Sequence, residues 1–310
     1  MRITAYIIAF SLIFISCEAQ VKRTGNPSSD ELRLYADQTE RTDPGEFTFL
    51  YEKLPRSYDS LNRLIKCQLV HPLEAAERGA NPHELSQDGR ILTVEGMLAE
   101  LYSLDSNGLN YNRKYDDRLV VACYHHAILL ASMLRYQGIP VRIRAGYSRF
   151  FEDKFGVRFS HVVCEAWSDE ERRWIMLDPD RELVDMDEND WDMAGKAWFK
   201  LKEGKYDPQK YTSSVSKGLK GTVYLMALDA EFVSGNEKIY WKLPKTVLED
   251  FEDFEDLGPE KTAQLEQLAE YLLDPDQKVD SIRIMLRQMP YMESTGITYE
   301  EYIQFVLRKE

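Results

Sequence analysis

Residues 123–147 read CYHHAILLASMLRYQGIPVRIRAGY, and this stretch decides the fold. One helical stripe of it carries Cys123, Ala127, Leu130, Ala131 and Leu134. This spacing predicts a core helix that begins at the cysteine. Gly138 can end the helix in a left-handed cap, and Pro140 cannot continue it. Apolar residues alternating with two arginines over residues 141–147 then predict a β-strand.

A β-hairpin is predicted further along the chain. Residues 161–167, HVVCEAW, and residues 173–178, RWIMLD, are separated by polar turn residues. With the turn centred on residues 169 and 170, His161 lies directly opposite Asp178, and opposed Cβ atoms are about 5 Å apart. A bulge of one residue in the turn would instead put the two side chains on opposite faces. The spacing therefore predicts an imidazole–carboxylate pair.

Cys123, His161 and Asp178 are the residue types of a thiol acyl-transfer enzyme. A free thiol with a pKa of about 8.5 is mostly protonated at neutral pH, but a helix N-terminus and a neighbouring imidazolium both favour the thiolate. In this scheme the cysteine is the nucleophile. The histidine carries the proton, and the aspartate fixes the tautomer and orientation of the imidazole ring.

The run from Cys123 to Tyr147, with LRYQGIPVR at residues 134–142, resembles bacterial transglutaminase-like proteins of the papain-type cysteine fold. The hairpin is similar too, because EAW at residues 165–167 and LDP at residues 177–179 match that family's acidic-x-Trp and Leu-Asp-Pro-like boxes. Weaker similarity extends over about residues 47–243. The resemblance implies an α+β fold, in which a central helix opened by the catalytic cysteine packs on an antiparallel sheet, with extra helices around it.

The residues around the cysteine depart from the family pattern. The family often has a small residue before the cysteine and an arginine after it, where this chain has Ala122 and Tyr124. Ala122 is itself small, whereas Tyr124 changes the mouth of the site. Relatives of this fold stabilise the oxyanion with the backbone N–H of the cysteine and a side-chain donor upstream of it. Gln68 is our candidate for that donor.

Two functions fit these residues. The first is an enzyme that attacks an amide or peptide bond through a Cys123 thioester and passes the acyl group to water or to an amine. The residues do not distinguish a peptidase or amidase from a cross-linking enzyme, because both share the first half-reaction. The second is a catalytically inert transglutaminase-like module that binds peptide or glycan at the cell envelope.

Other polar residues have competing readings. Cys123, His126, His161 and Cys164 are zinc-ligand types, but His161 and Cys164 leave a strand by opposite faces, and the chain has no Cys-x-x-Cys pair. No calcium loop or phosphate-binding glycine loop occurs either, so we expect no metal and no cofactor. His126 either donates a hydrogen bond to a residue of the site or is a core histidine whose ring nitrogens are hydrogen-bonded elsewhere. The arginines at 142 and 144 either meet a substrate carboxylate or form salt bridges.

The sequence at the amino terminus predicts that the protein is located in the bacterial cell envelope. Residues 5–15 are apolar and too short to span a bilayer, as in the core of a signal peptide. The sequence FISC at residues 14–17 resembles a lipobox, so we expect Cys17 to be lipidated and to anchor the protein to a membrane. Ordinary secretion with cleavage near Ala19 is the alternative. Without Cys17, Cys67, Cys123 and Cys164 remain; a Cys67–Cys164 disulfide is left open.

Composition and patterning complete the expected organisation. The chain has 310 residues, 44% of them hydrophobic, and a net charge of −14 that does not favour a nucleic-acid partner. After the signal peptide at 1–17 we expect a polar tether at 18–46, the transglutaminase-like domain at 47–243 and an acidic helical extension at 244–310. Helical patterns are predicted over residues 57–69, 94–104, 191–201, 259–273, 279–289 and 298–307, and residues 221–226 are predicted as a strand or a buried segment. The acidic face at 248–256 either recognises a cationic peptide or protein substrate or is a solvated surface.

Overall fold

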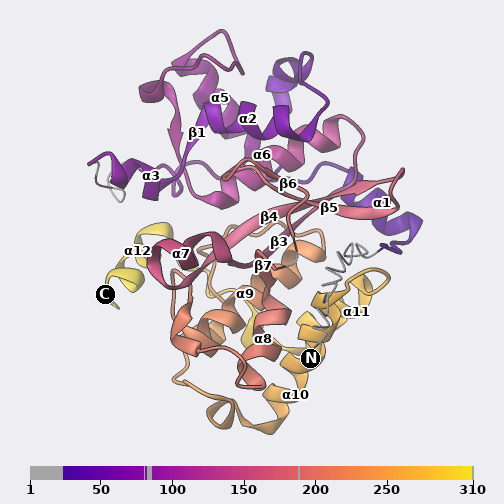
Figure 1. Cartoon of the computed structure of the whole chain (residues 1–310), viewed down its shortest axis with the longest axis vertical. Coiled ribbons are helices and arrows are strands. Elements are labelled where there is room, and N and C mark those ends of the chain that lie inside the picture. The colour runs from indigo at the N-terminus through magenta and orange to yellow at the C-terminus, as the bar shows by residue number, and fades with distance from the viewer. Residues whose placement is uncertain (1–23, 80, 82–85, 188, 309–310) are drawn as a thin grey trace, which may run out of the picture.

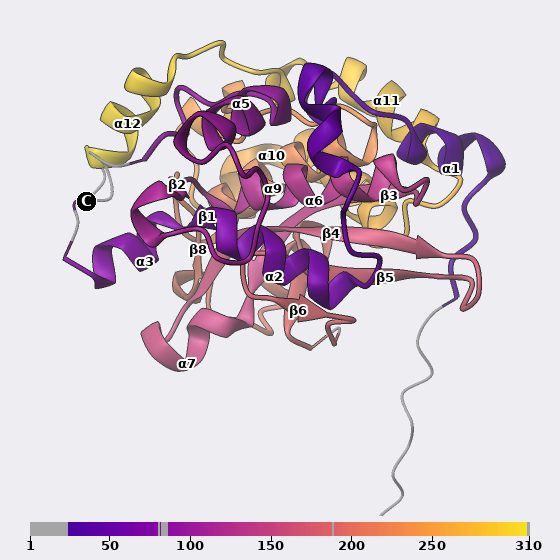
Figure 2. The ribbon, with the colours of Figure 1, turned by 90° about the horizontal axis from the view of Figure 1, so that it is seen from above.

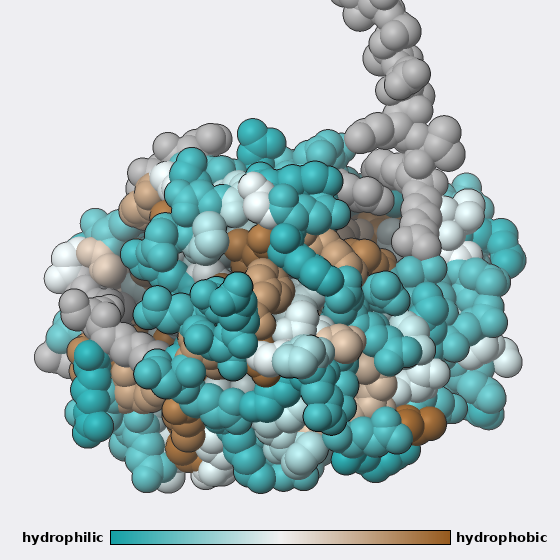
Figure 3. All heavy atoms as spheres, turned by 90° about the horizontal axis from the view of Figure 1, so that it is seen from below, coloured by the Kyte–Doolittle hydropathy of each residue, from teal (hydrophilic) through white to brown (hydrophobic). Residues whose placement is uncertain are grey.

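The structure, a computed structural model, describes residues 24–79, 81, 86–187 and 189–308. The predicted signal peptide and the candidate lipidation residue Cys17 lie outside the described residues. Among the helices that are described, none is both long and apolar enough to cross a bilayer. Hydrophilic residues cover most of the face drawn in Figure 3, with apolar residues visible between them.

A mostly antiparallel sheet forms the middle layer of the molecule (Figure 1). Its strands follow the order β6-β5-β4-β3-β7, and β8 pairs in parallel with β4. The strands of this sheet are β3 (Val141–Ser148), β4 (Arg158–Ser168), β5 (Arg173–Asp178), β6 (Leu183–Val184), β7 (Trp191–Met193) and β8 (Tyr211–Thr212). A separate parallel pair joins β1 (Leu69–Val70) to β2 (Leu119–Val120). That pair ends beside the start of the central helix.

The central helix, α6 (Cys123–Tyr136), begins at the cysteine as predicted. Gly138 has a φ of 79° and ends the helix in a Schellman motif, in which Ile139 N–H donates to Leu134 O and Gly138 N–H donates to Arg135 O. The helix packs on β3 and β4, and α8 (Ala194–Lys202) and α9 (Gly218–Val233) cover the other face of the sheet (Figures 1 and 2). This arrangement confirms the predicted α+β class.

The remaining helices surround these layers. They are α1 (Ser29–Ala36), α2 (Tyr58–Gln68), α3 (Pro72–Glu77), α5 (Val94–Leu104), α7 (Glu152–Phe155), α10 (Phe254–Leu273), α11 (Val279–Gln288) and α12 (Tyr299–Leu307), with short 3-10 turns between some of them. Ser57 is the N-cap of α2, and its hydroxyl oxygen accepts a hydrogen bond from Ser60 N–H. The helices predicted within residues 57–69, 94–104 and 191–201 and in the C-terminal part of the chain are thus confirmed within a few residues.

Residues 221–226 belong to α9, so a strand at this place is wrong and a buried segment is right. Most side chains of α9 are buried, because sheet and helices surround it. A helix buried on all sides loses the amphipathic period, and an apolar run without that period cannot be told from a strand.

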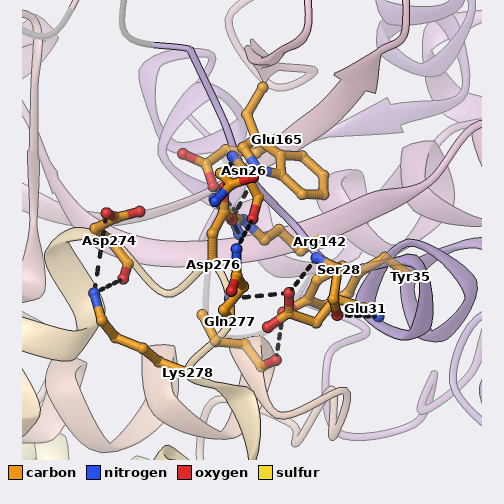
Figure 4. A network of polar contacts seen from close by, with 12 residues as sticks. Asn26, Ser28, Glu31, Tyr35, Arg142, Glu165, Asp274, Asp276, Gln277 and Lys278 are labelled. Carbon is orange, nitrogen blue, oxygen red and sulfur yellow. Dashed lines mark hydrogen bonds and ion pairs between the residues drawn. The ribbon is translucent and has the colours of Figure 1, made fainter.

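The segment predicted as a polar tether contains the helix α1, which begins at Ser29. Residues from Thr24 onward fold against the core, and Tyr35 on α1 is buried with its hydroxyl donating to Val233 O at 2.7 Å. Figure 4 shows how this segment is held: Asn26 N–H donates to Asp276 at 2.7 Å, and Gln277 Nε2 donates to Asn26 O at 2.9 Å. Specific hydrogen bonds and the burial of Tyr35 together hold these residues, and composition does not reveal such contacts.

The hairpin register also differs from the prediction. Ser168 pairs with Arg173 and Cys164 pairs with Leu177, so the turn holds four residues and includes Arg172 at a φ of 48°. His161 and Asp178 are therefore two positions out of direct opposition. Because the shift is an even number of residues, both side chains keep the same face of the sheet.

Arg142 and Arg144 form buried ion pairs. Arg144 donates to both oxygens of Asp229 on α9, at 3.0 and 2.9 Å, and both arginines donate to Glu165, at 2.6 and 3.0 Å. Burial alone would raise the pKa of Glu165, but the two guanidinium groups outweigh it and hold that pKa at about 2. The salt-bridge reading of these arginines is therefore confirmed, in the interior rather than on the surface. Glu165 lies opposite Met176 in the sheet.

Candidate active site

Cys123 occupies the first position of α6. Ala122, which precedes it, offers no side-chain cap, so the N–H groups of the first helical turn point out with their partial positive charge. A hydrogen bond fixes the backbone just before the helix, because Ala122 N–H donates to Asp88 Oδ1 at 2.8 Å. A helix N-terminus is thus aimed at the thiol, and it favours a thiolate.

His161 and Asp178 are joined by a 2.8 Å hydrogen bond between Nε2 and Oδ2. The other carboxylate oxygen, Oδ1, accepts the backbone N–H groups of Asp180 and Arg181 at 3.0 and 3.1 Å. Asp178 is fully buried, and these bonds fix its orientation. Because Nε2 faces the carboxylate, Nδ1 is the ring nitrogen left for the thiol of Cys123.

The thiol and the imidazole shift each other's pKa. Burial would raise the pKa of Cys123, but the charge and hydrogen bond of His161, together with those of His71, outweigh it and lower that pKa to about 6. Burial would lower the pKa of His161, but Asp178 and Cys123 outweigh burial and raise it well above its ordinary value of 6.5. The geometry therefore favours a thiolate–imidazolium pair at neutral pH.

His71 is a site residue that sequence reasoning missed. It hydrogen-bonds the Cys123 thiol, and its Nδ1 accepts the N–H of Leu73 at 3.2 Å as the N-cap of α3. Burial lowers the pKa of His71, but the charge of Asp180 and the bond to Cys123 outweigh burial and raise it. The sequence does carry one signal, a histidine in N-cap position before Pro72, although that signal indicates only a helix start.

Gln68 is not placed to serve as an oxyanion donor, so that prediction is wrong. Its Nε2 donates to Leu64 O at 3.0 Å and to Asn110 O at 2.7 Å, and its Oε1 accepts from Arg113 Nε at 2.7 Å. Both amide protons are therefore committed to backbone carbonyls, and the side chain is fully buried and does not line the cavity that contains the thiol. Gln68 instead ties α2 to the loop that leads into β2.

His126 is a buried core histidine. Its Nδ1 lies 3.2 Å from Ala122 O, its Nε2 lies 3.6 Å from Asp180 Oδ1, and burial lowers its pKa to about 3. Cys164 points away from His161 and donates to Ala127 O at 3.3 Å. Cys67, Cys123 and Cys164 are free thiols. Within the described part of the chain, no three His, Cys, Asp or Glu side chains are grouped as metal ligands.

A cavity of about 870 Å³ opens at the thiol. Cys123, His161 and His71 line it together with tyrosines of α9, α12 and the segment between them. The cavity is large enough for several residues of a peptide. The thiol and the imidazole of the predicted triad therefore lie where a substrate can reach them, and Asp178 is buried next to the imidazole.

Comparison with known proteins gives one match. The chain has no significant match among curated proteins or among solved structures. Residues 112–179 match the model of the transglutaminase-like superfamily. The matched segment runs from before β2 through the central helix and the hairpin, and it includes Cys123, His161 and Asp178. Residues 112–179 are thus similar to the transglutaminase-like superfamily.

Proposed function

We propose that this protein is a thiol enzyme that attacks amide or peptide bonds and forms an acyl-enzyme on Cys123. One observation carries the proposal: the imidazole of His161 is hydrogen-bonded both to the Cys123 thiol and, at 2.8 Å, to Asp178. This trio lies at a helix N-terminus and opens into a cavity. It has the parts that nucleophilic catalysis by a thiol requires.

The proposed reaction has two halves. The Cys123 thiolate attacks the carbonyl carbon, a C–S bond forms, and the electron pair of the carbonyl moves to the oxygen. As the oxyanion collapses, the C–N bond breaks and His161 gives its Nδ1 proton to the departing amine. Water or a second amine then attacks the thioester and gives a proton back to His161, and the thiolate leaves. Asp178 stabilises the imidazolium before the amine leaves and again when the proton returns, and it holds the neutral ring in between.

We assign the oxyanion to two donors, the backbone N–H of Cys123 and Nε2–H of His71. The N–H of a first helical residue has no acceptor within its own helix. Because Leu73 N–H donates to Nδ1 of His71, the proton of the neutral ring lies on Nε2. A donor that reaches the sulfur is also near the oxygen of an acyl group bound to that sulfur.

Two substitutions separate this role of His71 from its role as a helix cap. His71→Asn keeps a good N-cap but removes the donor near the thiol, whereas His71→Gln places an amide N–H near the position of Nε2. We expect kcat to fall by about 10²- to 10³-fold in the asparagine variant and to be partly restored in the glutamine variant. Equal activity of the asparagine variant and the wild type would exclude His71 as a donor.

Trapping of the acyl-enzyme tests the function itself. The purified protein is mixed with a panel of peptide amides and glutamine-containing peptides, quenched in acid and weighed intact. We expect an acyl adduct in the wild type and in the matched control Cys67→Ala, whose thiol is free and partly exposed, but not in Cys123→Ala. Added primary amine distinguishes hydrolysis from cross-linking. Peptide binding without any adduct would instead identify an inert binding module.

We further propose that the enzyme works in the bacterial cell envelope, anchored by a lipid on Cys17. The support is the apolar run at residues 5–15 and the FISC sequence that ends it. Cys17→Ala should move the protein from the membrane fraction to the soluble fraction. Unchanged membrane association would refute the anchor without bearing on the chemistry.

A further inference from the structure

The C-terminal helix α12 forms a wall of the cavity that holds the candidate nucleophile. Four of its side chains line that cavity: Tyr299, Tyr302, Ile303 and Val306. Their spacing of i, i+3, i+4 and i+7 is the apolar stripe that a surface helix normally turns toward a protein core. The stripe of this helix packs on the core, where Tyr302 is buried, and it also borders the cavity that holds Cys123, more than 170 residues earlier in the chain.

Aromatic side chains extend this wall toward the thiol. Tyr302 packs edge-on against Tyr240, with ring centroids 5.7 Å apart, and Tyr240 in turn lies 6.1 Å from the ring of Tyr124. Hydrogen bonds hold the rings in place, because Tyr240 OH donates to Asp88 at 2.7 Å and Tyr224 OH donates to Tyr240 O at 2.8 Å. The wall is therefore preorganised.

The wall carries little charge. Among the described residues that line the cavity, Asp88 and Lys217 are the Asp, Glu, Lys or Arg side chains. Asp88 is buried, and its oxygens accept from Ala122 N–H and the Tyr240 hydroxyl. Lys217 is exposed where α9 begins. The acidic segment at 248–256 does not contribute to the lining. A negatively charged group placed against the faces of the tyrosine rings would lose hydration without gaining a partner.

We infer that the enzyme selects acyl donors with an aromatic group next to the scissile amide, and that Tyr302 determines this preference. The inference rests on the proposed function, since it takes Cys123 as the point of attack. An aromatic side chain buries 150–250 Å² in proteins generally and gains further from edge-to-face contact with other rings. The stripe of α12 and the ring of Tyr240 provide such contacts, whereas a small side chain would leave the wall unfilled and an anionic one would lose its hydration there.

Two alkylating probes test the preference without a known substrate. The rate of Cys123 alkylation by N-phenyl iodoacetamide is divided by the rate with iodoacetamide, and the same ratio for glutathione corrects for intrinsic reactivity. We expect a corrected ratio of about 10 or more for the wild type, falling toward one in Tyr302→Ala. Leu307→Ala is the matched control, because Leu307 lies on the same helix, is 43% exposed and does not line the cavity. It should keep the wild-type ratio.

A milder variant guards against misfolding. If Tyr302→Ala does not fold, Ile303→Ala removes a smaller part of the same stripe and should lower the ratio in the same direction. A wild-type ratio near one, or a ratio unchanged by the folded variants, would overturn the inference. Failure of the proposed function would look different, since both probes would then react slowly and only at alkaline pH.

Discussion

Replacing His161 with alanine should raise the pKa of the Cys123 thiol and slow its alkylation at acidic pH. With a thiol pKa of about 6, half of the wild-type protein carries the thiolate at pH 6. Without the imidazolium, burial is opposed mainly by His71, and the pKa returns toward the ordinary value of about 8.5. At that value only about 0.3% of the thiol is ionised at pH 6, roughly 150-fold less than in the wild type.

The alkylation rate should fall by less than the thiolate fraction. A more basic thiolate is a better nucleophile, with a Brønsted coefficient of about 0.4–0.5, which returns a factor of roughly ten over this pKa range. The net loss at pH 6 is therefore about tenfold. The clearer signature is the midpoint of the pH profile, which should move upward by more than about one pH unit.

The assay is a pH series of iodoacetamide labelling, read by intact mass, in a Cys67→Ala background so that this partly exposed thiol adds no signal. Protein unfolded in urea gives the midpoint of an ordinary thiol. A midpoint that stays near 6 in His161→Ala would show that another group holds the thiolate. A wild-type midpoint equal to that of the unfolded chain would refute the activated thiol and, with it, the proposed enzyme.

Three further outcomes follow from the contacts. Asp178→Asn should lower kcat by about 10³-fold, which rate measurements at saturating substrate check. The amide oxygen of the asparagine keeps the two backbone N–H donors, so its NH₂ group faces Nε2 of His161. The proton of the neutral ring then lies on Nδ1, and that nitrogen cannot accept the proton of the thiol. The acid limb of kcat/KM should have an apparent pKa of about 6, set by the thiol, and a limb at 8 or above alone would contradict it. Asp229→Asn should lower the free energy of unfolding by about 3–5 kcal/mol in denaturant titration, because it leaves Arg144 buried with one carboxylate fewer. The control is Asp30→Asn, which breaks the exposed pair with Arg33 and should change that free energy by less than about 0.5 kcal/mol.

Local signals made the centre of the fold predictable. The start of α6 at Cys123 and its end at Gly138 follow from periodicity and cap chemistry, which act within a few residues. The hairpin was predicted with the right strands and the wrong register, because the left-handed φ of Arg172 is not encoded by a glycine or an asparagine. The pair of His161 and Asp178 still formed, since an even shift preserves the face of each strand.

The rest of the site depends on contacts between distant segments. His71 reaches the thiol because Val70 pairs with Val120 in a parallel bridge, which no local pattern announces. The stripe of α12 is readable in the sequence, but a stripe tells only that a face is covered, not that it covers a cavity. Gln68 was assigned as a donor by its position upstream of the cysteine, and only the tertiary structure shows its amide protons bound to Leu64 and Asn110.

Asp178 and Asp180, which flank Pro179, explain how several ionisable groups can share a buried site. Asp178 faces His161, and Asp180 lies near His71 and 3.0 Å from Lys66. In the thiolate–imidazolium form, the positive ring of His161 lies between the thiolate and Asp178, and Lys66 and Arg181 lie 3.0 and 3.8 Å from the oxygens of Asp180. A balanced cluster costs far less to bury than any of its members alone, because each charge is taken from water together with a partner. The thiolate can therefore persist beneath the cavity without the solvation that a lone anion needs, and the acyl group that it attacks meets a nucleophile already ionised.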